Sequence, residues 1–206
     1  MTDLLDQRLN RILPRITSED FLSGSGIGNE IAFYIFDYPP EDELRVRDFL
    51  QTLLDHIPKQ KPGLRVRHIN LLDFVVDYLK SRKLLDKAIQ MQRQKGDDAL
   101  KKALAGPLHE SKLGPVFADA AQPDQHDLVM VSGVGSAWPL LRSHTLLNNL
   151  QSVMGTTPLV MFYPGRYDGQ SLRLFGKIKS NNYYRAFKLV CCPLFVVGGS
   201  WLLGVT

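Results

Sequence analysis

Residues 128–136 read LVMVSGVGS, and this stretch decides the fold class. The four apolar residues at 128–131 are typical of a short strand that is buried on both faces. Two glycines then turn the chain toward a helix. A buried strand that leads through a glycine turn into a helix is a building unit of α/β proteins.

The same alternation continues in both directions along the chain. We expect further strands at 31–36, 64–69 and 159–162, and amphipathic helices at 41–57 and 70–79, the second capped by Asn70. A helix beginning at Pro139 is expected to carry its apolar face as far as Val153. Near the end, Asp168-Gly169 predicts a hairpin into 172–175, and a last strand follows at 183–190. The pattern predicts a three-layer α/β fold, with a mainly parallel sheet flanked by helices and a C-terminal antiparallel hairpin extension.

The two ends of the chain differ in character. The first has helical apolar spacing from Leu5 to Ile16, which Pro14 is expected to kink or end, and Ser18 is expected to cap a new helix. We expect one domain over 1–190, followed by an uncharged apolar tail at 191–206.

That tail and the cysteines bear on location. The 18 residues from Leu189 to Thr206 carry no charge, but their glycines and Pro193 argue against a membrane span. Two alternatives stay open for this tail: it packs on the domain, or it is a poorly ordered extension. The two cysteines are adjacent, at 191 and 192, and a bridge between neighbours is strained. With no signal-peptide pattern at the N-terminus, these features predict a cytoplasmic protein.

The positive charge of the chain is concentrated in residues 80–112, here called the basic segment. It has nine Lys or Arg against four Asp or Glu, a net of +5, while the whole chain has +4. We expect helices here, broken at Gly96 and at 106–107. Two interpretations stay open: the solvated face of a helix, or a nucleic-acid surface that includes Lys87, Arg93, Lys101 and Lys102.

No enzyme motif stands out in the sequence. Gly133, Gly135 and Ser136 could bind an anion at a helix N-terminus, although a tight strand-to-helix turn is the favoured explanation of these residues. A dinucleotide site would need a third glycine where Trp138 stands. The histidines lack metal-binding spacing, so we expect no metal. Because no enzyme motif stands out, we also expect no catalytic residues and no cofactor.

The segment from Tyr163 to Gly169 is the densest in interaction chemistry. It contains Tyr163, Arg166, Tyr167 and Asp168, and tyrosine and arginine are enriched at protein-binding hot spots. The alternative is a plain hairpin in which Arg166 pairs locally with Asp168.

Several motifs occur in an order that resembles a known family. They are Gly28-Asn29-Glu30 before the strand that ends in Tyr38-Pro39-Pro40, the strand and turn at 131–136, the 163–169 loop, and Tyr183-Tyr184-Arg185-Ala186-Phe187. Over residues 1–190 the chain resembles the BrxB family, the small B proteins of bacteriophage exclusion (BREX) systems. Members usually end soon after the last motif, so the tail is a departure.

The resemblance implies a non-catalytic, protein-binding subunit of a phage-defence complex. It implies an adaptor that joins the phosphatase-like protein PglZ to other components, with the methyltransferase and the ATPase as further partners. No catalytic residues can be carried over from the family. Tyr183, Tyr184 and Arg185 then join the 163–168 residues as candidate partner-binding residues.

Overall fold

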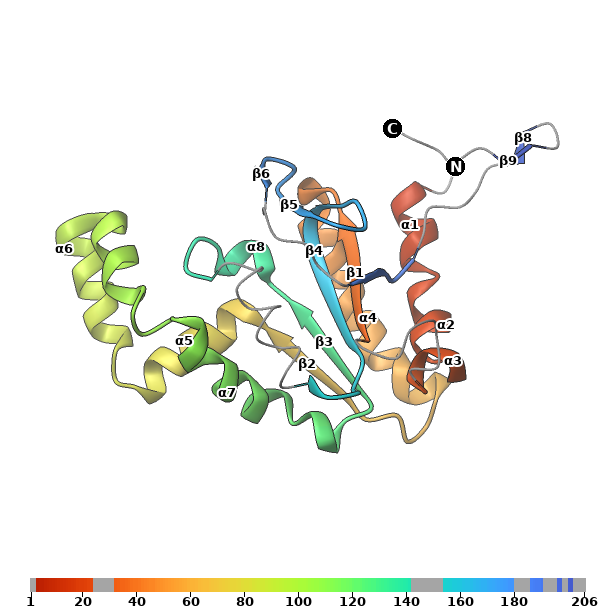
Figure 1. The fold of residues 1–206 in the computed structure, drawn as a ribbon, viewed down its shortest axis with the longest axis horizontal. Helices are drawn as coiled ribbons and strands as arrows, with labels where there is room; N and C mark the ends of the chain where they lie inside the picture. Colours follow the sequence, from red (N-terminus) through yellow and green to blue (C-terminus); the bar gives the residue numbers. More distant parts are fainter. Residues whose placement is uncertain are drawn as a thin grey trace.

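The computed structural model describes residues 3–23, 32–141, 154–179 and 186–190, together with two short strands further on. A mostly parallel sheet lies between two layers of helices (Figure 1), which confirms the predicted three-layer α/β fold. Five parallel strands stand in the order β2-β3-β4-β1-β7: β1 (Phe33–Tyr38), β2 (Val66–Asn70), β3 (Leu128–Ser132), β4 (Leu159–Tyr167) and β7 (Phe187–Lys188).

The predicted hairpin extension is also present. β5 (Leu172–Leu174) runs antiparallel to the end of β4, and β6 (Ile178–Lys179) runs antiparallel to β5. Of the strand expected at 183–190, the structure assigns Phe187–Lys188, while 183–185 lie outside the described residues. In the tail, β8 (Val196–Val197) pairs only with β9 (Ser200–Trp201) within the described part of the chain.

Helices cover both faces of the sheet. One face carries the N-terminal helices and the long helix after β1: α1 (Leu4–Leu9), α2 (Ile12–Ile16), α3 (Glu19–Leu22) and α4 (Glu43–Gln60), the last preceded by the 3-10 turn η1 (Pro40–Asp42). The other face carries α5 (Leu71–Ser81), α7 (Glu110–Ala121) and α8 (Val134–Ala137), with the 3-10 turn η2 (Pro123–Gln125) after α7. The remaining helix, α6 (Leu85–Leu104), extends away from the sheet (Figure 1).

The core is divided between the two faces because side chains alternate along each strand. On β1, Ile35 packs in one cluster with Val131 and Met161. The next residue, Phe36, packs in the other cluster with its β4 neighbour Phe162. Burying one such side chain stabilises the fold by about 1.5–3 kcal/mol. Both faces of the central strands are therefore apolar, as the continuous hydrophobic runs predict.

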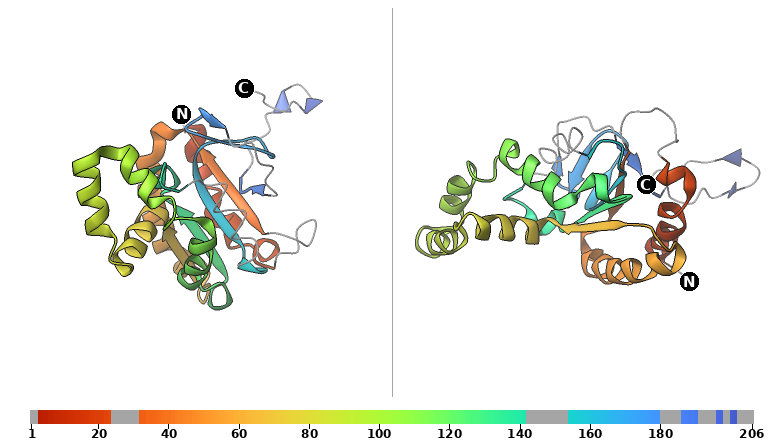
Figure 2. Two further views of the ribbon diagram at one scale, coloured as in Figure 1. Left: turned by 60° about the vertical axis from the view of Figure 1, so that its left-hand side comes forward. Right: turned by 90° about the horizontal axis from the view of Figure 1, so that it is seen from below.

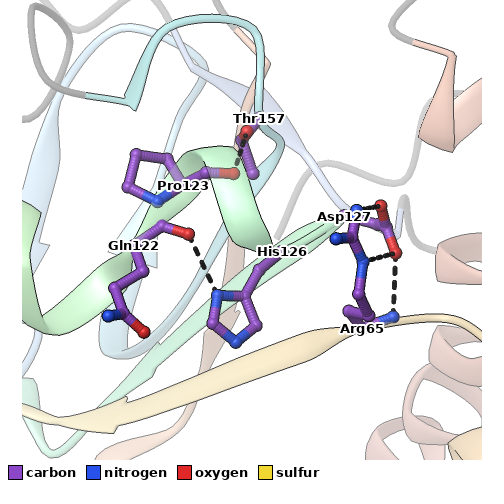
Figure 3. A network of polar contacts seen from close by, with 6 residues as sticks. All are labelled: Arg65, Gln122, Pro123, His126, Asp127 and Thr157. Carbon is purple, nitrogen blue, oxygen red and sulfur yellow. Dashed lines mark hydrogen bonds and ion pairs between the residues drawn. The ribbon is translucent and has the colours of Figure 1, made fainter.

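Polar contacts fix the connection into β3 (Figure 3). Arg65 donates to both carboxylate oxygens of Asp127, from Nη2 at 2.7 Å and from Nε at 3.2 Å. Thr157 Oγ1 donates to the Pro123 carbonyl at 3.0 Å, which joins the start of β4 to the turn after α7. The beginnings of β2, β3 and β4 are thus tied together at one edge of the sheet.

Several local predictions can be compared with the structure. The Asn70 cap is confirmed, since its side-chain oxygen accepts from the amides of Leu72 and Asp73. The break at Gly96 is confirmed by a φ of 80° inside α6. The expected break at Pro14 is wrong: the chain breaks at Asn10 and Arg11, and Pro14 lies in the first turn of α2, where a missing amide costs little.

The helix predicted to begin at Pro139 also needs correction. The short helix α8 begins earlier, at Val134, and Pro139 lies in the turn that follows it. The apolar residues expected to form that helix face, 146–153, lie outside the described residues. Within the described ranges, no helix combines the length and the apolar content that a membrane crossing requires.

One charged side chain is buried in the middle of this architecture. Asp37, on the otherwise apolar strand β1, has a side chain that is 12% exposed. Its Oδ1 accepts from Arg8 Nη2 at 2.7 Å, and its Oδ2 accepts from the Tyr167 amide at 2.9 Å. The Arg8 guanidinium also lies over the Phe36 ring, 4.7 Å from its centroid. Asp37 therefore joins helix α1, the central strand and the end of β4.

We expect Asp37→Ala to lower the free energy of unfolding by about 3–5 kcal/mol, because it leaves Arg8 buried without its counter-charge. The Tyr167 amide would lose its acceptor as well. Asp37→Asn, which keeps an oxygen for that amide, should cost less and remains measurable if the alanine variant does not fold. Urea denaturation followed by circular dichroism measures both.

The matched control is Asp127→Ala, which removes the carboxylate from the exposed pair with Arg65. Its Arg65 partner has a side chain that is 59% exposed, so solvent screens the ion pair, and the Arg65 amide that also donates to Asp127 can bind water instead. The loss should be about 1–2 kcal/mol, smaller than for Asp37→Ala. Equal losses for the Asp37 and Asp127 variants would contradict the central role of Asp37.

Candidate functional site

The loop from 163 to 169 divides into buried and exposed residues. Tyr163 and Tyr167 are 1% and 0% exposed, so these two tyrosines are core residues and do not present a contact surface in the folded domain. The Tyr167 hydroxyl donates to the Ala186 carbonyl at 2.7 Å. This corrects the expectation that the tyrosines contact a partner: their role visible here is to hold the hairpin on the sheet.

Two arginines face each other on the exposed side of the hairpin. Arg166 on β4 and Arg173 on β5 are cross-strand partners, and both are exposed. Directly opposed like charges destabilise a sheet. Together with Asp168 they line a small hollow of about 290 Å³. We call Arg166, Asp168 and Arg173 the hairpin surface.

Asp168 organises the turn of this hairpin. Its carboxylate accepts from the amides of Gln170 and Ser171 and from the Ser171 hydroxyl, at 2.7–2.9 Å. These bonds, first of all the one from the Ser171 amide, lower the pKa of Asp168 to about 2. Asp168 therefore holds the turn through Gln170 and Ser171. Its described contacts do not include the local pairing with Arg166 that was the alternative for this loop.

Close packing at the base of the hairpin fixes its position. A Cβ on Gly165 would clash with the carbonyl oxygen of Arg173, so only glycine allows the two strands to approach here. Beside them, Trp138 is 39% exposed and packs edge-on against Phe175, with ring centroids 6.0 Å apart. The hairpin surface thus has an exposed aromatic side chain near its base.

A larger cleft lies elsewhere, at the carboxyl ends of β2 and β3. It has a volume of about 760 Å³ and is lined by residues of α4, α5 and both strands. Within it, His68 Nε2 lies 2.9 Å from Ser132 Oγ. Burial lowers the pKa of His68, against an opposing effect of Asp73, so the neutral ring is favoured.

A neutral histidine beside a serine hydroxyl is the first element of a hydrolytic relay. Such a relay also needs a third group that orients the imidazole. Within the described residues, no carboxylate forms a hydrogen bond with the His68 ring. Asp73 affects the ring only through its charge. The hydrogen bond to His68 gives a partner to the hydroxyl of Ser132, a residue that is only 7% exposed.

The glycine turn at 133–136 lies next to this cleft. A Cβ on Gly133 would overlap the Asn70 side chain, and one on Gly135 would press on Pro164 and Phe175. Close packing therefore accounts for both glycines. Ser136 is exposed and lines the cleft, but α8 has only four residues, so it offers little of a helix dipole to an anion.

The remaining predicted residues lie on separate parts of the molecule. Lys87, Arg93, Lys101 and Lys102 are exposed on α6, far from the hairpin surface in Figure 1. Tyr183, Tyr184 and Arg185 lie outside the described residues. The structure therefore keeps Arg166 and Asp168 together and separates them from the basic segment.

Sequence reasoning missed three residues that matter to this arrangement. Asp37 was detectable as the single charge in the apolar run 33–38. Arg173 could have been found from the hairpin register, since it and Arg166 stand at equal distances from the turn. Trp138 gave no such signal, because its neighbour Phe175 is distant in sequence.

We expect the stability of the protein to depend on His68 in a defined direction. A folded-state pKa below the unfolded value means that the unfolded chain binds more protons, so the free energy of unfolding should fall as the pH drops below about 6.5. His68→Gln should remove this part of the pH dependence. Urea denaturation at pH 8 and pH 5.5 measures it.

His56→Gln is the control, because His56 is exposed on α4 and bonds only its own helix through the Thr52 carbonyl among the described contacts. It should keep the wild-type difference between the two pH values. An unchanged difference in the His68 variant would show that the ring titrates alike in both states.

Comparison with known proteins places the chain. The family described as BREX protein BrxB matches residues 67–189. A BREX protein BrxB of Escherichia coli O9:H4 (strain HS) is 43% identical over 187 residues, which cover 91% of this chain and 92% of that protein. Another, of Bacillus cereus (strain H3081.97), is 42% identical over 190 residues, covering 90% and 97%. No solved structure matches the chain.

The two relatives match most of this chain and most of their own length. The family match alone includes the strands from β2 to β7 and the hairpin surface. The chain therefore belongs to the BrxB family of BREX-system proteins.

Proposed function

We propose that this member of the BrxB family is a non-catalytic adaptor of a BREX phage-defence complex and that it binds its partner through the hairpin surface. Membership of the family supports a role in phage defence with other BREX components as partners. Our first choice of partner is the phosphatase-like PglZ protein, followed by the methyltransferase and the ATPase.

The observation that carries this proposal is the exposed pair of Arg166 and Arg173. Facing like charges cost stability in the free protein, and an acidic group from a partner would remove that cost. Arginine also binds carboxylates through two parallel hydrogen bonds, which gives geometric specificity. A partner with one or two carboxylates would therefore fit this surface.

Two further features favour a protein partner here. Trp and Arg are enriched at interface hot spots, and Trp138 stands exposed beside the hairpin. The hairpin is also held in place by the buried Tyr167 and by Asp37, so little conformational freedom would be lost on binding.

A catalytic role is less well supported by the contacts of the cleft. His68 and Ser132 form one hydrogen bond, and Ser132 is nearly buried. An adaptor role requires no reactive group in that cleft.

The test is a tagged pull-down from cells that express the whole defence operon. Arg166→Glu/Arg173→Glu should lose the partner that the wild type retains, because two favourable contacts become repulsive. The matched control is Lys101→Glu/Lys102→Glu, which makes the same change in net charge on the distant helix α6.

Mass spectrometry of the retained proteins identifies the partner. Retention of PglZ by the wild type and the control, but not by the hairpin variant, is the expected result. A hairpin variant that retains every defence protein would refute this surface, and a wild type that retains none would refute the adaptor role.

Stability and binding should change in opposite directions for Arg166→Glu alone. The substitution converts a repulsive cross-strand pair into an attractive one, so the free energy of unfolding should rise by about 0.2–1 kcal/mol. Partner binding should weaken at the same time. Thermal denaturation and the pull-down measure the two effects, and a loss of stability would show that the arginines do not repel each other in the free protein.

A further inference from the structure

The helix α6 forms an arm that has little contact with the domain. It extends from the end of α5, bends at Gly96 and returns toward α7, as both views of Figure 2 show. Leu104 is the one residue of α6 that is buried in the described structure. The inner side of the helix, with Leu85, Ala88 and Leu100, is partly buried against the core. The rest of the arm faces solvent.

The cations of the basic segment are exposed along and beside this arm. All nine of its Lys and Arg side chains are exposed: Lys80, Arg82, Lys83, Lys87, Arg93, Lys95, Lys101, Lys102 and Lys112. Within the described part of the chain, Lys80 is the one that forms an ion pair, with Asp77 at 3.1 Å. The net charge of +5 is thus left largely uncompensated by neighbouring groups.

The composition of this surface distinguishes between classes of ligand. Seven of the nine cations are lysines, and residues 80–112 contain no Phe, Tyr or Trp. Lysine is depleted at protein interfaces, which are enriched in aromatic side chains and arginine. Proteins that bind single-stranded nucleic acids stack bases on aromatic rings, which this surface lacks. Exposed lysines without aromatic groups suit the phosphate backbone of a duplex, where charge neutralisation supplies the affinity.

We propose that the α6 arm binds the phosphate backbone of double-stranded nucleic acid without reading its sequence. The bend at Gly96 places Lys87 and Arg93 on one half of the arm and Lys101 and Lys102 on the other. Cations on both halves would neutralise several phosphates at once. This surface is separate from the hairpin surface, so duplex binding and partner binding can be abolished independently.

The test is fluorescence anisotropy of the full chain with a labelled DNA duplex of about 30 base pairs, over a series of salt concentrations. The variant Lys87→Glu/Lys101→Glu/Lys102→Glu should bind at least about tenfold more weakly at low salt. The slope of log K against log salt should decrease by about 0.9 for each phosphate that the variant no longer neutralises. The matched control is Lys59→Glu/Lys177→Glu/Lys188→Glu, which changes three exposed lysines outside the segment.

An RNA duplex of the same sequence identifies which duplex the arm prefers, and binding of either one supports the proposal. Equal weakening by the arm variant and the control would overturn it, as would a wild type that binds neither duplex at low salt. Tighter binding of the single strand, or equal competition by polyglutamate of matched charge, would also overturn it. The Arg166→Glu/Arg173→Glu variant should keep duplex binding, so failure of the adaptor role is distinguishable from failure of this proposal.

Discussion

The buried carboxylate of Asp37 is the constraint on which the rest of the structure depends. It lies on a central strand, and its two oxygens accept from Arg8 and from the Tyr167 amide. A charge in an apolar layer is tolerated only when it is paired and hydrogen-bonded. The N-terminal helix and the end of β4 must therefore both be in place for the sheet to contain this residue. Asp37 therefore also fixes the position of Tyr167, the last residue of β4 before the hairpin turn.

The facing arginines of the hairpin surface are expected to cost stability, and the fold itself does not explain why they are there. Arg166 and Arg173 oppose each other, whereas the rest of the hairpin is well satisfied: Asp168 holds the turn, Tyr167 is buried, and Gly165 permits close strand pairing. Natural proteins retain unfavourable local arrangements mainly at functional sites. A rigid support under two exposed arginines that face each other is consistent with a surface that is completed by an acidic partner.

The charged surfaces of the protein are spatially separate. The arginine pair lies on the hairpin after β4, while the lysine-rich arm extends from the layer of α5 and α7 (Figure 1). Their chemistry differs as well, since one combines arginine with a nearby tryptophan and the other has lysines without aromatic residues. A subunit with two such surfaces could hold a protein partner and a duplex at the same time, a property expected of an adaptor in a multi-protein defence complex.

The sequence by itself determined the α/β class, the buried strands, the Asn70 cap, the bend at Gly96 and the hairpin after β4, because these depend on periodicity and on residues with strong local preferences. It also showed where the positive charge is concentrated. Only the tertiary structure decided that Tyr163 and Tyr167 are core residues and that Asp37 joins α1 to β4. Those facts depend on contacts between segments up to 130 residues apart, which no local pattern encodes.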